Sequence, residues 1–144
     1  MSVPKHRRNP SSVEFDNTYY SVYDDAMTII ENAFGASAQD RELHADYIAV
    51  HGREVMTLVT RLLYHIRIAN SIYPTCQAEK DERRLNQDKA IGICYTIMTV
   101  YQLVMHRLKT PEDKYTTYIK DLIHEINCLK SWRTSDNKRF GSLG

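Results

Sequence analysis

The chain has 144 residues and a mass of 16.8 kDa, a size that fits one domain rather than a multi-domain enzyme. Its 42% hydrophobic and 26% charged residues exclude a compositionally disordered chain, and its formal net charge of +1 excludes a uniformly basic one. With only 5 Gly and 4 Pro, the chain has too few turn-forming residues for the many turns of an all-β fold, so its composition favours long helices.

Apolar residues recur at alternating steps of three and four in four separate windows, which is the period of an α-helix and not of a strand. These windows fall within residues 19–34, 55–73, 91–108 and 115–129. Each has a second apolar row beside the first, so the apolar face is wider than the seam of a two-stranded coiled coil. Such wide faces require several neighbouring helices.

Local signals predict where the first two helices begin and end. Ser11 or Ser12 can cap the first helix, and Gly35 follows its last apolar residue. Asp40 can cap the second helix. We expect that helix to end near Asn70, because the sequence that follows contains a proline at position 74.

The third helix is predicted to begin near Glu79. Thr110 followed by Pro111 is typical of an N-cap and a first helical position, so the fourth helix is expected to start there and to run to about Trp132. Since all three connections are short, consecutive helices should be antiparallel. The predicted fold is an all-α, up-down-up-down four-helix bundle.

The predicted organisation is one domain with two basic extensions. Residues 1–10 form a basic N-terminal tail, residues 11–132 form the four-helix bundle, and residues 133–144 form a basic C-terminal tail. By sequence, residues 1–10 and 130–144 each carry a net charge of +3, which leaves −5 for residues 11–129. In an up-down-up-down bundle both termini and the link between helices two and three lie at the same end, so we expect a basic end.

A clustered basic surface is typical of proteins that neutralise nucleic-acid phosphates. The candidate residues for binding a nucleic acid or a polymerase are Lys5, Arg7, Arg8, Arg67, Arg83, Arg84, Arg133, Lys138 and Arg139. The aromatic residues interleaved with them, Tyr73, Trp132 and Phe140, could stack on unpaired bases. The alternative is that short basic tails only keep the chain ends solvated.

Catalytic and metal-binding motifs are lacking in the sequence. His124 and Glu125 are followed by Cys128 where the metalloprotease motif requires a second histidine, and no glutamate is followed by histidine three positions later, as a di-iron bundle requires. There is no G-x-S-x-G nucleophile motif and no glycine-rich phosphate loop. We therefore expect a protein that is not an enzyme and that uses no cofactor or metal.

The three cysteines, Cys76, Cys94 and Cys128, are odd in number and form no C-x-x-C pair, which argues against a disulfide framework or a zinc knuckle. The N-terminal residues lack the apolar segment of a secretory signal. The longest uncharged stretch, 91–105, is shorter than the roughly 20 residues of a membrane helix. The sequence therefore predicts a soluble cytoplasmic protein without a membrane partner.

The chain contains 10 tyrosines, most of them within the predicted helices and too many for one small core. Aromatic side chains with a polar tip are enriched at subunit interfaces, which favours a homo-oligomer. The alternative is that these side chains lie at the edge of the bundle with their hydroxyls in water.

Short segments across the chain resemble one protein family. They are Ser2-Val3-Pro4-Lys5 with Arg7-Arg8, Ala69-Asn70-Ser71-Ile72-Tyr73-Pro74, Arg83-Arg84 with Gln87 and Ala90-Ile91, and Leu129-Lys130-Ser131-Trp132-Arg133 with Ser135-Asp136-Asn137-Lys138. Together they resemble the small four-helix-bundle proteins related to the accessory variability determinant of diversity-generating retroelements, and more distantly the proteins encoded in ribosomal RNA intervening sequences.

The resemblance implies a non-catalytic accessory subunit that forms a pentamer and binds the retroelement's reverse transcriptase with template RNA or cDNA. In such systems the polymerase copies a template RNA with errors at adenines, and the cDNA replaces part of a target gene. Because this chain has a net charge of only +1, we expect polymerase contact to matter more than extensive RNA wrapping. The alternative function is a helical structural or protein-interaction module whose partner is a protein only.

Overall fold

The computed structural model describes residues 11–141, with side chains described from residue 17 onward, and this part of the chain contains helices and no strand. Four long helices account for most of it: α1 (Ser11–Glu31), α3 (Ala45–Ser71), α4 (Gln77–Arg107) and α5 (Thr116–Arg139). Three short elements lie in the connections: η2 (Ala33–Gly35), α2 (Ala38–Leu43) and η3 (Glu112–Lys114).

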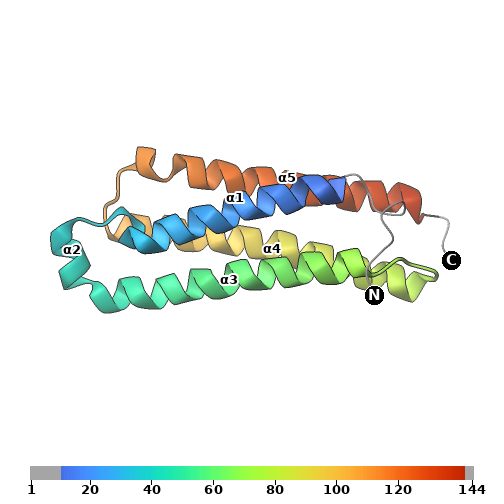
Figure 1. Ribbon diagram of the computed structural model, residues 1–144, viewed down its shortest axis with the longest axis horizontal. Helices are drawn as coiled ribbons and strands as arrows, with labels where there is room; N and C mark the ends of the chain where they lie inside the picture. The colour runs from blue at the N-terminus through green and yellow to red at the C-terminus, as the bar shows by residue number, and fades with distance from the viewer. Residues whose placement is uncertain (1–10, 142–144) are drawn as a thin grey trace.

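The long helices lie side by side, and each runs antiparallel to the next (Figure 1). Helix α1 packs against α3 and α5, and α4 packs against the same two helices from the other side. As a result α3 ends, α4 begins and α5 ends at the same end of the molecule, at the right in Figure 1. The all-helical fold that the apolar periodicity predicts is confirmed.

The predicted apolar rows form the core. Val55, Val59, Leu62 and Ile66 follow one face of α3 and are at most 1% exposed, because steps of three and four residues return a side chain to the same side of a helix. Tyr19 of α1 is buried beside them, and its hydroxyl donates a 2.7 Å hydrogen bond to the carbonyl oxygen of Val59. Burial of its ring therefore leaves no unsatisfied hydroxyl there.

The connection between α1 and α3 differs from the prediction. Ser37, not Asp40, is the N-cap: its hydroxyl accepts a hydrogen bond from the backbone N–H of Asp40, which starts the short helix α2. The next long helix begins only at Ala45. Between α1 and α2 the chain passes through three consecutive left-handed residues, at positions 33–35, two of which are not glycine. Of these three residues the sequence marks only Gly35, as a helix-end signal, and not Ala33 or Phe34.

The start and the end of α5 also differ from the prediction. Thr110 does not cap a helix; its hydroxyl donates to the carbonyl oxygen of Phe34 at 2.8 Å, and α5 begins at Thr116. At the other end the helix continues past Trp132 to Arg139. Most of the expected basic tail at 133–144 is therefore helical, and its cations occupy defined positions on α5.

Within residues 11–141, no helix combines the length and the apolar character required to cross a bilayer.

Candidate nucleic-acid interface

The end where α3, α4 and α5 meet has a basic excess. Residues 67–89 and 130–141, which we call the basic end, contain nine lysines and arginines against five aspartates and glutamates. The predicted residues Lys5, Arg7 and Arg8 lie outside the described residues. The described part of the basic end is therefore formed by α3, α4, α5 and the link between α3 and α4.

Arg83 does not lie on the surface of this end. It is 3% exposed, and its guanidinium donates to both carboxylate oxygens of Asp136, at 2.5 and 3.1 Å. The same guanidinium donates to the carbonyl oxygens of Ala69 and Ile72, at 3.1 and 2.7 Å, where α3 ends. Arg83 therefore satisfies carbonyls that a helix C-terminus otherwise leaves without partners.

Aromatic rings enclose the same guanidinium. Its central carbon lies 5.0 Å from the ring centre of Trp132 and 5.5 Å from that of Phe140, within the range of cation–π attraction. Gln87 donates a third hydrogen bond to Asp136, at 2.7 Å. We call these five residues, Arg83, Gln87, Trp132, Asp136 and Phe140, the Arg83 cluster. It joins the end of α3, the start of α4 and the end of α5.

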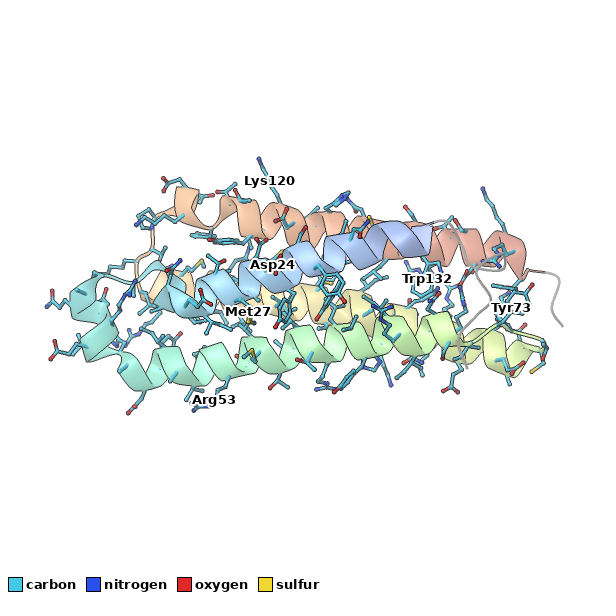
Figure 2. All side chains as sticks on the ribbon, in the orientation of Figure 1. Asp24, Met27, Arg53, Tyr73, Lys120 and Trp132 are labelled. Carbon is cyan, nitrogen blue, oxygen red and sulfur yellow. The ribbon has the colours of Figure 1, made fainter. Side chains whose placement is uncertain are left out.

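These contacts correct the assignment of three residues as surface contacts. Trp132 is fully buried and Phe140 is 5% exposed, so neither ring presents a face on which a base could stack, and Arg83 is enclosed with them (Figure 2). Their common role is to hold the helices together at this end. Sequence reasoning missed Asp136 as the partner of Arg83, since 53 residues separate the two.

The neighbouring cations follow the seam between α4 and α5 and are accessible. Arg84 donates to the side-chain oxygen of Asn137 at 2.8 Å, an exposed contact. Arg133 is ion-paired with Asp88 at 2.6 Å, and both side chains keep substantial exposure to water. Each of these cations is held by a contact across the seam, so its position is defined although it faces solvent.

Lys130 continues this row toward the middle of the molecule. Its ammonium donates to the hydroxyl of Tyr95 at 3.2 Å and lies 5.6 Å from the centre of the same ring. Tyr95 is 47% exposed. A shallow depression beside Lys130 is lined by polar side chains of α5, including Ser131, Thr134 and Ser135. Such a surface offers a cation, hydroxyls and an exposed aromatic ring together.

The remaining predicted residues lie near the end of α3, in the link after it and at the end of α5. Arg67, Lys138 and Arg139 are exposed. The guanidinium of Arg139 lies 6.0 Å from the ring centre of Tyr73 and 4.9 Å from that of Phe140. Tyr73 packs edge-on against Phe140 and is 36% exposed, so it is the one ring of the three predicted stacking residues that reaches the surface (Figure 2).

The interior also holds ionisable groups. Glu125 of α5 is fully buried and accepts a 3.1 Å hydrogen bond from the hydroxyl of Thr18. Burial is the main cause that raises the pKa of Tyr19 to about 12, with smaller contributions from two neighbouring tyrosines and from Glu125. Burial, followed by the charge of Glu125, also raises the pKa of the Cys94 thiol. Cys94 is therefore a core thiol and not an activated nucleophile.

A pair of carboxyl groups links α1 to α5. Partial burial first, and then a hydrogen bond with Asp121, raises the pKa of Asp25 to about 8. Two carboxyls can share a hydrogen bond only when one of them carries a proton. Burial and the nearby Asp25 charge also raise the pKa of the Tyr101 hydroxyl.

Across the described part of the chain, no group of three or more His, Cys, Asp and Glu side chains is arranged to hold a metal ion. His51 contacts Glu54 at 2.9 Å, and His65 contacts Asn86 at the same distance.

Comparisons with protein-family models, curated proteins and solved structures gave no match to this chain.

Proposed function

We propose that the protein is a non-catalytic accessory protein that binds a nucleic acid, and with it a polymerase, through the basic end. The observation that carries the proposal is the row of accessible cations Arg84, Lys130 and Arg133 along the α4–α5 seam. Lys138, Arg139 and Tyr73 extend this surface to the tip.

The proposed mechanism is positioning of phosphates without reading of base sequence. Lysine and arginine side chains neutralise phosphates and release the counterions that surround a nucleic acid, which strengthens binding at low salt. The contacts with Asn137, Asp88 and Tyr95 orient three of the cations before binding, which reduces the entropy lost in the complex. Tyr73 supplies an accessible ring for stacking on an unpaired base.

The specific role that we propose is that of an accessory subunit in a diversity-generating retroelement. The packing of α1, α3, α4 and α5 supports an up-down-up-down four-helix bundle, the architecture that the sequence resemblance implies. In this role the protein would be a homo-oligomer, a pentamer by the resemblance, and would bind the reverse transcriptase together with template RNA or cDNA.

Anisotropy of a fluorescent single-stranded RNA, measured from 50 to 200 mM salt, tests the proposed nucleic-acid contact. If four cations contact phosphates, affinity should fall on the order of 50-fold over this interval, from a slope of about −0.7 per contact on logarithmic axes. An Arg84→Gln/Lys138→Gln variant should bind more weakly and reduce the slope by about 1.4. Arg53→Gln/Lys120→Gln, which removes the same charge away from the basic end, is the control and should match the wild type. Equal weakening in both variants would reject the site.

Light-scattering mass of the protein, alone and co-expressed with a retroelement reverse transcriptase and its template RNA, tests the proposed role. The role predicts a homo-oligomer that gains mass with the polymerase and RNA. A mass unchanged by either partner would reject it.

A second candidate function is a protein-interaction module, and one surface favours it. The groove between α1 and α3 exposes apolar surface, and Met56 in it is 48% exposed. A cavity of about 180 Å³ lies in this groove, lined by Ile30, Ile48 and Met56. Binding through such a surface depends on apolar burial, so its affinity would not fall as salt rises. The salt series therefore separates the two functions.

A further inference from the structure

The end of the molecule opposite the basic end contains a cavity of about 260 Å³. Its walls come from α1, the η2 turn, α2, the last turns of α4, and the link into α5. Its lining combines buried apolar side chains, among them Phe34 and Met105, with the polar residues Arg41, Thr110 and Lys114. This volume is below the ~300–1,000 Å³ of pockets for drug-sized ligands, so an occupant would be small.

Arg41 is held in position at this cavity. Its Nε donates to the carbonyl oxygen of Ala36 and its Nη2 donates to that of Asn32, both at 3.1 Å. A guanidinium carries five N–H groups, so these two bonds leave three donors for another partner. Because the backbone fixes its orientation, the side chain would lose little freedom on binding a ligand.

Lys114 supplies a second cation to the same cavity. Among the described residues, neither Arg41 nor Lys114 has a carboxylate within the 4.0 Å of an ion pair. Around them the surface is acidic: residues 31–46 and 105–121 contain seven aspartates and glutamates against five lysines and arginines. The two cations are thus a local feature, and a long polyanion would be repelled by the surrounding surface.

The wall of the cavity is a left-handed turn that the rest of the fold supports. Ala33 and Phe34 have φ values of 50° and 56°, which non-glycine residues adopt at an energetic cost. The carbonyl oxygen of Phe34 accepts the 2.8 Å hydrogen bond from Thr110, in the link between α4 and α5. At Gly35 a Cβ would lie 2.9 Å from the Thr110 methyl group, so the two segments are in close contact. The cavity is therefore bounded by segments that are bonded to each other.

We propose that this cavity binds a small organic anion, with its phosphate or carboxylate group contacting Arg41 and Lys114 and its organic part in the remaining volume of the cavity. Phosphate and carboxylate share the chemistry that recognises them here, since both present anionic oxygens to a guanidinium and an ammonium. Tyr118, which also lines the cavity, adds a hydroxyl, whereas the proton of the Thr110 hydroxyl is already donated to the carbonyl oxygen of Phe34. The site is separate from the basic end and does not depend on the function proposed for it.

Isothermal titration with phenyl phosphate, benzoate, inorganic phosphate and phenol, the last as a neutral probe, tests the proposal. We expect saturable binding of phenyl phosphate or benzoate, with the tighter of the two identifying the anionic group, and no binding of phenol. Amide NMR shifts at Gly35 and at Thr110 should change during the titration. Absence of saturable binding by both organic anions, or inorganic phosphate binding as tightly as phenyl phosphate, would overturn the proposal.

Variants distinguish the cavity from general attraction of anions to a protein surface. Lys114→Gln should weaken binding about tenfold or more, the usual effect of one hydrogen bond to a charged group, and Arg41→Gln/Lys114→Gln should weaken it further. The control is Arg53→Gln/Lys120→Gln, whose two side chains lie on opposite outer sides of the molecule (Figure 2). Since Arg41 also bonds the turn, Lys114→Gln alone decides the question if the double variant loses helicity. An equal loss in the control would overturn the proposal.

Discussion

Arg83→Met is the substitution that most sharply separates a structural role from a surface role at the basic end. It removes two hydrogen bonds to Asp136 and two to the carbonyls that end α3, and it removes the cation between two aromatic rings. It also leaves the buried Asp136 carboxylate with Gln87 as its remaining donor in the Arg83 cluster. Breaking a buried ion pair from one side typically costs about 3–5 kcal/mol, because the other charge stays buried.

Urea unfolding followed by helical circular dichroism measures this cost. A loss of about 3–5 kcal/mol is a large share of the ~5–15 kcal/mol that holds a domain folded, so the midpoint should shift markedly. Asp136→Asn should also destabilise the protein, because the buried guanidinium of Arg83 then loses a charged partner and one of its two acceptor oxygens. The double variant Arg83→Met/Asp136→Leu should cost less than the sum of the single changes, because it leaves no buried charge unpaired.

Arg84→Met is the matched control, since it makes the same replacement at the adjacent, exposed residue. Arg84 has one exposed hydrogen bond, to Asn137, so the loss of stability should stay within about 0.5 kcal/mol. RNA affinity should show the reverse pattern, with Arg84→Met weakening binding while the fold stays intact. The reasoning is refuted if Arg83→Met unfolds at the same urea concentration as Arg84→Met.

Four further predictions concern other parts of the molecule. Because the pKa of Asp25 is raised from 3.8 to about 8, folding takes up a proton between these values and stability falls as pH rises through them. Asp25→Asn should reduce this pH-dependent loss of unfolding free energy by about 1–2 kcal/mol, a figure lowered because Asp25 is partly exposed to solvent. Urea unfolding at pH 5 and pH 9 measures the loss, and a variant that loses as much stability as the wild type would contradict the prediction. Gly35→Ala should cost about 1–2 kcal/mol, because φ is +76° there and a Cβ would meet a neighbour at 2.9 Å. Gly92→Ala, in a helix with nothing within 4 Å, should gain about 0.5–1 kcal/mol in the same unfolding assay. A thiol reagent should modify the exposed Cys76 in the native protein and the buried Cys94 only after unfolding, and equal rates would contradict this.

The helices were predictable because their signal is repeated along the chain. A buried row such as Val55, Val59, Leu62 and Ile66 reports the helical period at every step, so one exception does not hide it. A helix boundary depends on one or two residues. Thr110 has the properties of an N-cap, yet its hydroxyl bonds to Phe34, which is 76 residues away in the sequence. A tertiary contact of this kind overrides the local preference, and no pattern in the neighbouring residues records it.

The basic end was predictable in its location but not in the roles of its residues. Counting charge treats Arg83 and Arg84 alike, whereas successive residues on a helix point about 100° apart. One guanidinium therefore faces the core and the other faces water. Trp132 is buried beside the first for the same reason, as its position on α5 faces α4. The partner of the enclosed arginine, Asp136, lies 53 residues away in the sequence, so a local charge count does not identify the pair.

The cavity beside Arg41 had no sequence signal at all. Its turn uses left-handed backbone at Ala33 and Phe34, residue types that rarely adopt it, so nothing in their identity marks the position. Its cations lie in a region whose overall charge is acidic, and a count by segment conceals them. Such a site becomes visible only when the chain is placed in space.

The two ends of the molecule present cations in physically different ways. At the basic end, the buried guanidinium of Arg83 joins three helices, so Arg84 and Arg133 stand on a fixed framework and face open water, where a long polyanion can pass. At the opposite end, Arg41 is fixed by backbone carbonyls at a cavity that admits only a small molecule. Helix α3, with 27 residues and therefore about 40 Å in length, separates the two. Since salt screens charges beyond about 10 Å, the cations of one end do not act electrostatically on a ligand at the other. Any influence of the small anion on the basic end would therefore have to pass through the packing of the helices.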